Sequence, residues 1–373
     1  MGDRRWLKLA AAGAGATFAA VTAGVVVERR VVKSRRAGSS GADELGGLHS
    51  KAITVLTDDG VRLHAEVDEV TPYAERAAKT QTGKGIKRLR RADSPAPTIV
   101  FVHGYALSLD CWHFQRAWFR GKHRLVFFDQ RSHGRSGKSD KRHATIDQLG
   151  DDLLRVLDDL VPEGPVVLVG HSMGGMAVMA FAERHPEVFE ARVTGVALVS
   201  TTAGGLKTHH VVSRLIPDSI GGEIGARLIA GLALAPDLVD RVRRRGSNVG
   251  FLVADQFAFG EDVPDSYVEF VNNMLAATSF EVLAQFFPNF DTLDKFDSLG
   301  AFARVPTYIL SGTKDVLTSV GHSRKMAKRI AGSTLVECLG AGHMVILEQK
   351  ERVNSALDDL VAAAALGRAS QVS

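Results

Sequence analysis

Cysteine is scarce in this sequence. Only Cys111 and Cys338 occur among 373 residues, in unrelated contexts and without a Cys-x-x-Cys or Cys/His spacing. A disulfide scaffold and a structural zinc site both require more cysteines at closer spacing, so neither is expected to organise this chain. We expect two free thiols, with a single disulfide as the alternative. No spacing of His, Cys, Asp or Glu implies a metal or an organic cofactor, and none is expected.

A strong compositional bias is also absent. Hydrophobic residues make up 45% of the chain, charged residues 24% and aromatic residues 7%, which excludes a collagen-like or wholly disordered protein. The net charge is only +4. Part of the basic excess lies in residues 74–96, which lack interleaved aromatics and any nucleic-acid motif. We therefore predict an exposed insertion there and expect no nucleic-acid partner.

One long apolar run stands apart: residues 9–27 are uncharged and rich in Ala, Gly and Val. A helix of this length approaches the ~30 Å hydrocarbon core of a bilayer, so a signal anchor that attaches the chain to a membrane is favoured. Arg4 and Arg5 precede the run as in a twin-arginine export signal, which is one alternative; a merely apolar tail is another. Basic residues on both sides leave the side of the membrane open.

Short apolar runs recur along the rest of the chain, and each leads into a helical stretch. They lie at 98–102, 125–128, 165–169, 193–199, 305–310 and 334–338. Their lack of alternation suits strands buried on both faces, and their alternation with helices predicts a parallel sheet covered on both sides. Residues 52–70, broken at Asp58-Asp59-Gly60, predict an antiparallel hairpin that opens the sheet. The expected fold class is α/β, with a mostly parallel sheet of eight strands.

This rhythm breaks once, over about a hundred residues that look mostly helical and hold ten of the 18 phenylalanines. We predict an inserted helical cap there, with most of these rings, such as Phe251, Phe257, Phe259, Phe286 and Phe287, forming its core and its seam with the sheet. The chain then divides into a membrane-directed segment with a flexible Gly/Ser-rich tether (1–48), a first part of the core (49–204), the cap (205–304) and a second part of the core (305–373).

Gly170-His171-Ser172-Met173-Gly174-Gly175 follows one of the apolar runs and leads into a helical stretch, which is the context of a nucleophile elbow. The small residues Gly170 and Gly174 allow the tight strand-to-helix turn to close. The hydroxyl of Ser172 then projects outward at a helix N-terminus, where negative charge is favoured. Ser172 is the predicted nucleophile.

A serine hydroxyl is a weak nucleophile unless a base removes its proton and a carboxylate holds that base in the right tautomer. His343, in a glycine-rich loop after the last predicted strand, is the candidate base. Asp315, which follows the run at 305–310, is the candidate acid. Its competitors are Asp291, Asp294 and Asp297.

The developing oxyanion needs backbone N–H donors. His103-Gly104-Tyr105 lies at the end of the first central strand, and the N–H groups of Tyr105 and Met173 are the predicted donors. His103 itself is interpreted as a structural residue that supports the loop.

Together with Asp129-Gln130-Arg131-Ser132-His133-Gly134-Arg135-Ser136, these motifs resemble the α/β-hydrolase superfamily, in particular its small esterases, lipases and cofactor-free haloperoxidase-like members. The resemblance covers roughly residues 50 to 365 and implies the α/β-hydrolase fold. Ser132 stands where glycine is usual in those families. Epoxide hydrolases and haloalkane dehalogenases of this fold carry aspartate at the elbow, so Ser172 argues against both.

The expected function is therefore hydrolysis of a small-molecule carboxylic ester with an apolar, even lipid-like, acyl group, through an acyl-enzyme on Ser172 with His343 as base and Asp315 as orienting acid. A haloperoxidase-like perhydrolase or a carbon–carbon bond hydrolase would use the same triad and is the alternative within enzymes. An inactive membrane-tethered binding protein is the alternative outside them. The sequence does not predict the oligomeric state.

Overall fold

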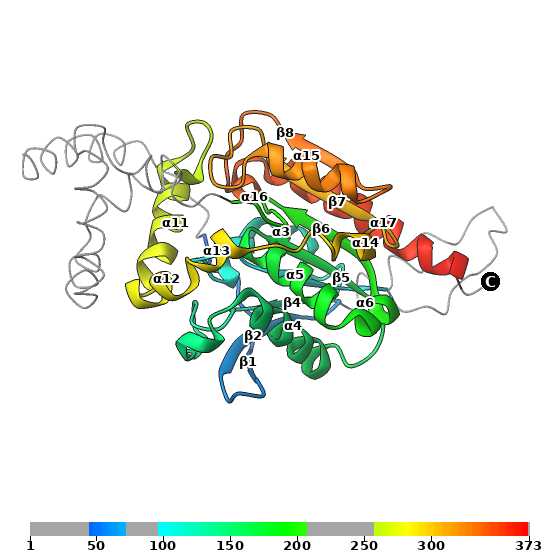
Figure 1. Ribbon diagram of the computed structural model, residues 1–373, viewed down its shortest axis with the longest axis horizontal. Helices are drawn as coiled ribbons and strands as arrows, with labels where there is room; N and C mark the ends of the chain where they lie inside the picture. Colours follow the sequence, from blue (N-terminus) through cyan, green and yellow to red (C-terminus); the bar gives the residue numbers. More distant parts are fainter. Residues whose placement is uncertain (1–44, 72–95, 207–256, 372–373) are drawn as a thin grey trace, which may run out of the picture.

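One sheet of eight strands organises the computed structural model, which describes residues 45–71, 96–206 and 257–371 (Figure 1). The strand order is β1-β2-β4-β3-β5-β6-β7-β8. The pairs β1/β2 and β2/β4 are antiparallel and the other five are parallel, which confirms the predicted fold class. The strands are β1 (Ala52–Leu56), β2 (Arg62–Asp68), β3 (Thr98–Val102), β4 (Leu125–Phe128), β5 (Val166–His171), β6 (Val193–Val199), β7 (Thr307–Gly312) and β8 (Thr334–Cys338).

Alternate residues of the central strands point into two separate hydrophobic cores. Val100 and Val102 of β3 pack in one core with helices α4 and α5, whereas Ile99 and Phe101 pack in the other with α3 and α17. All four side chains are at most 1% exposed. Because both faces of the sheet are buried, its strands are continuously apolar rather than alternating.

Helices cover both faces of the sheet. They are η1 (Leu109–Trp112), α3 (His113–Phe119), η2 (Lys141–His143), α4 (Ile146–Leu160), α5 (Met173–Arg184), α6 (Pro186–Arg192), α11 (Asp265–Ala277), α12 (Phe280–Phe286), α13 (Asn289–Thr292), α14 (Leu299–Phe302), α15 (Val320–Arg329), α16 (Val345–Glu348) and α17 (Lys350–Gln371). Because β3 and β5–β8 run parallel, the loops that follow them meet at one edge of the sheet.

The helices α11 to α14 fall within the segment predicted to be a cap. Figure 1 shows α11 and α12 beyond one end of the sheet. By contrast, Phe302 of α14 packs on Phe189 of α6, with ring centroids 5.2 Å apart, so the end of this segment lies against the core. Phe259 and Phe286 are buried, as expected for rings in a seam. Residues 207–256, with Phe251, lie outside the described residues, and the boundaries 205–304 stay a prediction.

Two further predictions fall on residues outside the described ranges: the apolar run at 9–27 and nearly all of the basic insertion at 74–96. Among the residues described, no helix combines the length and apolar character needed to span a bilayer. Membrane attachment through residues 9–27 therefore stays a prediction. Cys111 and Cys338 are both free and buried, as expected.

Candidate active site

Ser172 lies in the tight turn between β5 and α5. Its backbone has φ 52° and ψ −120°, a conformation that L-residues rarely adopt and that is found at strained functional turns. The turn closes because Gly170 and Gly174 lack side chains: a Cβ at position 174 would lie 2.1 Å from the carbonyl oxygen of Val102, and one at position 170 would lie 2.7 Å from the backbone of Gly174. The residue is 9% exposed, so it is close-packed and still reaches the surface.

The backbone of Ser172 is held from β6 and the loop after it. Its N–H donates to the carbonyl oxygen of Val199 at 2.9 Å, and its own carbonyl oxygen accepts from the Thr201 hydroxyl at 2.7 Å. Both bonds fix the turn without involving the Ser172 hydroxyl. The sequence did not single out Thr201, because its contact depends on how β5 and β6 pair.

Asp315 and His343, predicted from different loops, are brought together. Nδ1 of His343 lies 2.9 Å from Oδ2 of Asp315. The other carboxylate oxygen accepts from the N–H groups of Leu317 and Thr318 at 2.9 Å each. Burial alone would raise the pKa of Asp315, but the neighbouring His343 and the hydrogen bonds from Thr318 outweigh it and hold that pKa below its usual value. The competitors Asp291, Asp294 and Asp297 are not in this contact.

The loop of His343 lies against the elbow. Nε2–H of His171, the residue before Ser172, donates to the main-chain carbonyl oxygen of His343 at 3.0 Å, and the two rings lie 4.9 Å apart. Burial lowers the pKa of His171 to about 3, with the neighbouring His343 adding to the effect, so this ring is neutral at physiological pH. One hydrogen bond thus joins the loop of the candidate base to the residue that precedes the candidate nucleophile.

The predicted oxyanion loop approaches Ser172 from β3. A Cβ on Gly104 would lie 2.9 Å from Nδ1 of His171 and 3.0 Å from Cβ of Ser172, so no other residue lets the loop come as close. Tyr105 follows directly, and its hydroxyl donates to the carbonyl oxygen of Leu283 in α12 at 2.6 Å. Of the two predicted donors, Tyr105 thus follows the residue that lies against Ser172, and Met173 comes directly after Ser172 in the elbow.

His103 has the structural role expected of it. Its Nδ1–H donates to the carbonyl oxygen of Gly104 at 2.7 Å, and its Nε2 accepts from the N–H of Gln130 at 2.9 Å. Burial lowers the pKa of His103 to about 3, so the neutral ring can hold both bonds. It ties the loop after β3 to the loop after β4.

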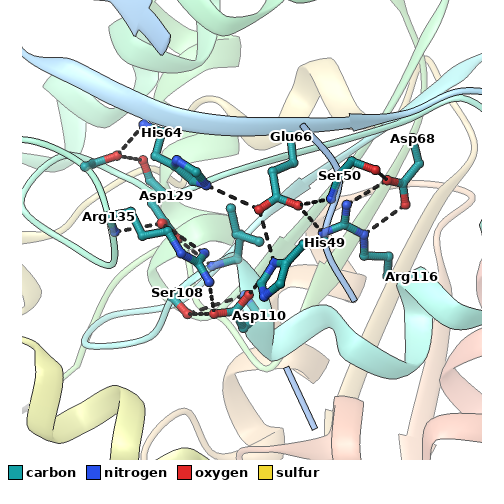
Figure 2. Close-up of polar contacts among 12 residues, drawn as sticks. His49, Ser50, His64, Glu66, Asp68, Ser108, Asp110, Arg116, Asp129 and Arg135 are labelled. Carbon is teal, nitrogen blue, oxygen red and sulfur yellow. Dashed lines mark hydrogen bonds and ion pairs between the residues drawn. The ribbon is translucent and has the colours of Figure 1, made fainter. Parts of the chain in front are cut away.

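A buried carboxylate strengthens this tie. Asp129 accepts from the N–H of Leu109 at 2.7 Å and from that of Arg135 at 2.8 Å. Figure 2 shows Asp129 beside Arg135, whose guanidinium reaches Asp110 at 2.7 Å. Burial raises the pKa of Asp129 to about 6, against the opposing effect of these N–H donors. Asp129 thus links the segment after Tyr105 to the 129–137 loop.

Figure 2 also shows a second group of charged side chains, Arg116, Glu66 and Asp68. The guanidinium of Arg116 in α3 donates to Glu66 at 2.7 Å and to Asp68 at 2.6 and 2.9 Å. All three side chains are at most 3% exposed. These bonds join α3 to β2, and we interpret them as structural.

Ser132 departs from the usual glycine without disturbing the loop. Its φ is 65°, in the left-handed region that glycine adopts most easily. Its hydroxyl oxygen accepts from the N–H of Ser139 at 2.9 Å, which offsets part of the cost of that conformation. Within the ranges that the structure describes, no group of three His, Cys, Asp or Glu residues is placed to hold a metal ion.

Comparisons with known proteins extend these observations. A model of the alpha/beta hydrolase family matches residues 99–356. The chain is 28% identical over 269 residues to 3-oxoadipate enol-lactonase 2 of Acinetobacter baylyi. This match covers 72% of the chain and 89% of the relative. Its fold is similar to that of a thermophilic esterase from Thermogutta terrifontis (TM-score 0.60, 20% identity, 84% and 99% of the two chains). It is also similar to the enol-lactonase from Burkholderia xenovorans LB400 (TM-score 0.58, 22% identity, 83% and 100%).

Proposed function

Because the chain belongs to the alpha/beta hydrolase family, we propose that it is a serine hydrolase that cleaves a carboxylic ester through an acyl-enzyme on Ser172. The observation that carries this proposal is the contact between Asp315 and His343 beside the elbow of Ser172. A carboxylate can only accept hydrogen bonds, so the proton of the His343 ring is on Nδ1. Nε2 then has a free lone pair, which is what a general base requires.

The first half-reaction transfers the acyl group. Nε2 of His343 takes the proton of the Ser172 hydroxyl while Oγ attacks the ester carbonyl carbon. Asp315 stabilises the imidazolium that forms. The tetrahedral intermediate collapses when His343 gives its proton to the leaving alcohol, and Ser172 keeps the acyl group. In the second half-reaction, His343 takes a proton from water, whose oxygen attacks the acyl carbon. The second tetrahedral intermediate collapses when His343 returns this proton to Oγ of Ser172, which releases the acid.

The negative oxygen of both intermediates would be held by the N–H groups of Tyr105 and Met173. Met173 begins α5, whose twelve residues direct a partial positive charge toward the site. One such donor is worth roughly 10²- to 10³-fold in kcat in comparable sites.

An ester substrate with an apolar acyl group agrees with the surroundings of the loop after β3. The ring of Tyr105 packs edge-on against Phe290, with centroids 5.2 Å apart, and Phe290 packs on Phe287. An enol-lactone is a cyclic ester, so similarity to an enol-lactonase supports the same class of bond.

The test is labelling with a fluorophosphonate, which phosphonylates an activated serine and releases fluoride. We expect the full-length protein to be labelled and Ser172→Ala to lose the label. Ser200→Ala is the matched control, because Ser200 directly follows β6 as Ser172 directly follows β5, is fully buried and also has a positive φ of 43°. Absence of labelling on the folded protein, or labelling that survives Ser172→Ala, would refute the proposal.

Substrate assays then separate ester hydrolysis from other reactions of the same triad. We expect p-nitrophenyl octanoate to be cleaved faster than the acetate, and a preference for acetate would count against an apolar acyl site. Faster peracid formation from acetate and hydrogen peroxide than ester hydrolysis would favour a perhydrolase instead. Labelling without turnover of any ester would favour a binding protein.

A further inference from the structure

Glu348, the last residue of α16, bonds to two segments that are far apart in the chain. Its Oε1 accepts from the N–H of Gly342 at 2.8 Å, and its Oε2 accepts from the N–H of Gly260 at 2.9 Å. Gly342 precedes the candidate base His343, and Gly260 lies in the segment that leads into α11. One carboxylate therefore joins the loop of the base to the segment before α11.

These two segments are in direct backbone contact. A Cβ on Gly342 would lie 2.5 Å from the backbone of both Phe259 and Gly260. The N–H of Met344, on the other side of His343, donates to the carbonyl oxygen of Ala258 at 2.8 Å. The position of His343 is thus set by how residues 258–260 dock on its loop, with Glu348 bonded to both.

The opposite side of the loop is fixed as well. A Cβ on Gly312 at the end of β7 would lie 2.2 Å from the carbonyl oxygen of Ala341, and the N–H of Lys314 donates to that oxygen at 2.9 Å. His171 holds the carbonyl oxygen of His343. Glu348 adds a further restraint, because it accepts from the N–H of Gly342, the residue before the candidate base.

We propose that Glu348 is a positioning residue for the reaction: it joins residues 258–260 to the loop at 340–343 and so fixes the imidazole of His343 relative to Ser172. The inference rests on the proposed function. Both carboxylate oxygens of Glu348 are bonded to backbone N–H groups, so its removal should affect the chemical step more than substrate binding. A displacement of a catalytic group by 1 Å can cost about 10²-fold in rate.

The test substitutes Glu348→Gln, which keeps the shape of the side chain and one acceptor oxygen but turns an NH₂ group toward one of the two N–H donors. Glu351→Gln is the matched control, since Glu351 is exposed one residue into α17. Active sites are counted by fluorophosphonate titration, so that only folded molecules enter the comparison. We expect kcat per titrated site to fall roughly 10- to 100-fold in Glu348→Gln, with KM changed less than about twofold, and Glu351→Gln to match the wild type.

A second measurement does not depend on turnover. Amide hydrogen exchange should become faster in peptides that cover residues 257–261 and 340–344 in Glu348→Gln, and should not change there in Glu351→Gln. Unchanged kcat per titrated site, even with a lowered Tm, would overturn the proposal, because a purely structural role predicts that result. Failure of the proposed function looks different: wild-type turnover would survive Ser172→Ala.

Discussion

The hydroxyl of Thr318 donates to Oδ2 of Asp315 at 2.9 Å, the same carboxylate oxygen that lies 2.9 Å from Nδ1 of His343. Oδ1 of Asp315 meanwhile accepts from two backbone N–H groups, one of them that of Thr318 itself. Thr318 therefore orients the carboxylate at both of its oxygens. The face that Asp315 presents to His343 depends on this residue.

Thr318→Val removes the hydroxyl and keeps the shape of the side chain. A hydrogen bond to a charged group is worth about 1.5–3 kcal/mol, so we expect kcat to fall roughly tenfold or more with little change in KM. Thr334→Val, an exposed position at the start of β8, is the control and should retain full activity. An unchanged kcat in Thr318→Val would show that the backbone N–H groups alone orient Asp315.

The difference between Thr318 and Asp315 shows how far the sequence predicts this molecule. Apolar runs between helical stretches predicted the strands, because a sheet buried on both faces leaves a strong local signal. Asp315, His343 and Ser172 were predicted as site residues because each follows a strand in a recognisable context. Thr318 was not predicted, because an aspartate followed three residues later by a threonine is a common spacing in ordinary turns.

Glu348 was beyond prediction for another reason. Its partner Gly260 is 88 residues away in the chain, and most of the intervening sequence belongs to other elements. Nothing local distinguishes a carboxylate that accepts from distant backbone N–H groups from one that faces solvent.

The strained backbone conformation of Ser172 should lower the stability of the protein. A non-glycine residue in a sparsely populated backbone conformation costs about 1–3 kcal/mol, and glycine removes this strain. Glycine also makes the unfolded chain more flexible, which lowers the stability and offsets part of the gain. We expect Ser172→Gly to be more stable than Ser172→Ala by about 1 kcal/mol. Both variants lack the hydroxyl and should be inactive, so they form a matched pair. Thermal unfolding measures the difference, and an equal or lower Tm for the glycine variant would contradict the strain.

Gly174 should tolerate no side chain. A Cβ there would lie 2.1 Å from the carbonyl oxygen of Val102 and 2.6 Å from that of His103, and both are main-chain atoms that cannot turn away. We expect Gly174→Ala to lose about 3 kcal/mol of stability and to lose fluorophosphonate labelling. Gly300→Ala is the control, since Gly300 is in helix α14 with no atom within 4 Å of its Cβ position, and helix propensity should leave it neutral or slightly more stable. Similar Tm values for the two variants would contradict the close approach of residue 174 to the carbonyl oxygen of Val102.

The stability of the protein should fall in mild acid, partly through His133. Its Nδ1–H donates to the carbonyl oxygen of Arg131 at 2.9 Å, and its Nε2 has no hydrogen-bond partner among the described residues. Burial lowers the pKa of His133 to about 4, although the carbonyl of Arg131 opposes this effect. In the unfolded chain a histidine titrates near 6.5.

The sign of the effect follows from these two values. Between pH 6.5 and about 4 the unfolded state binds a proton that the native state does not, so the free energy of unfolding decreases as the pH falls, by up to about 1.4 kcal/mol per pH unit. His133→Phe removes this contribution and keeps an aromatic ring against Phe286, whose centroid lies 5.4 Å away. Urea unfolding at pH 6.5 and pH 5 should therefore show the wild type losing about 1.5 kcal/mol more than His133→Phe. Equal losses in the two proteins would mean that the pKa of His133 is not lowered in the native state.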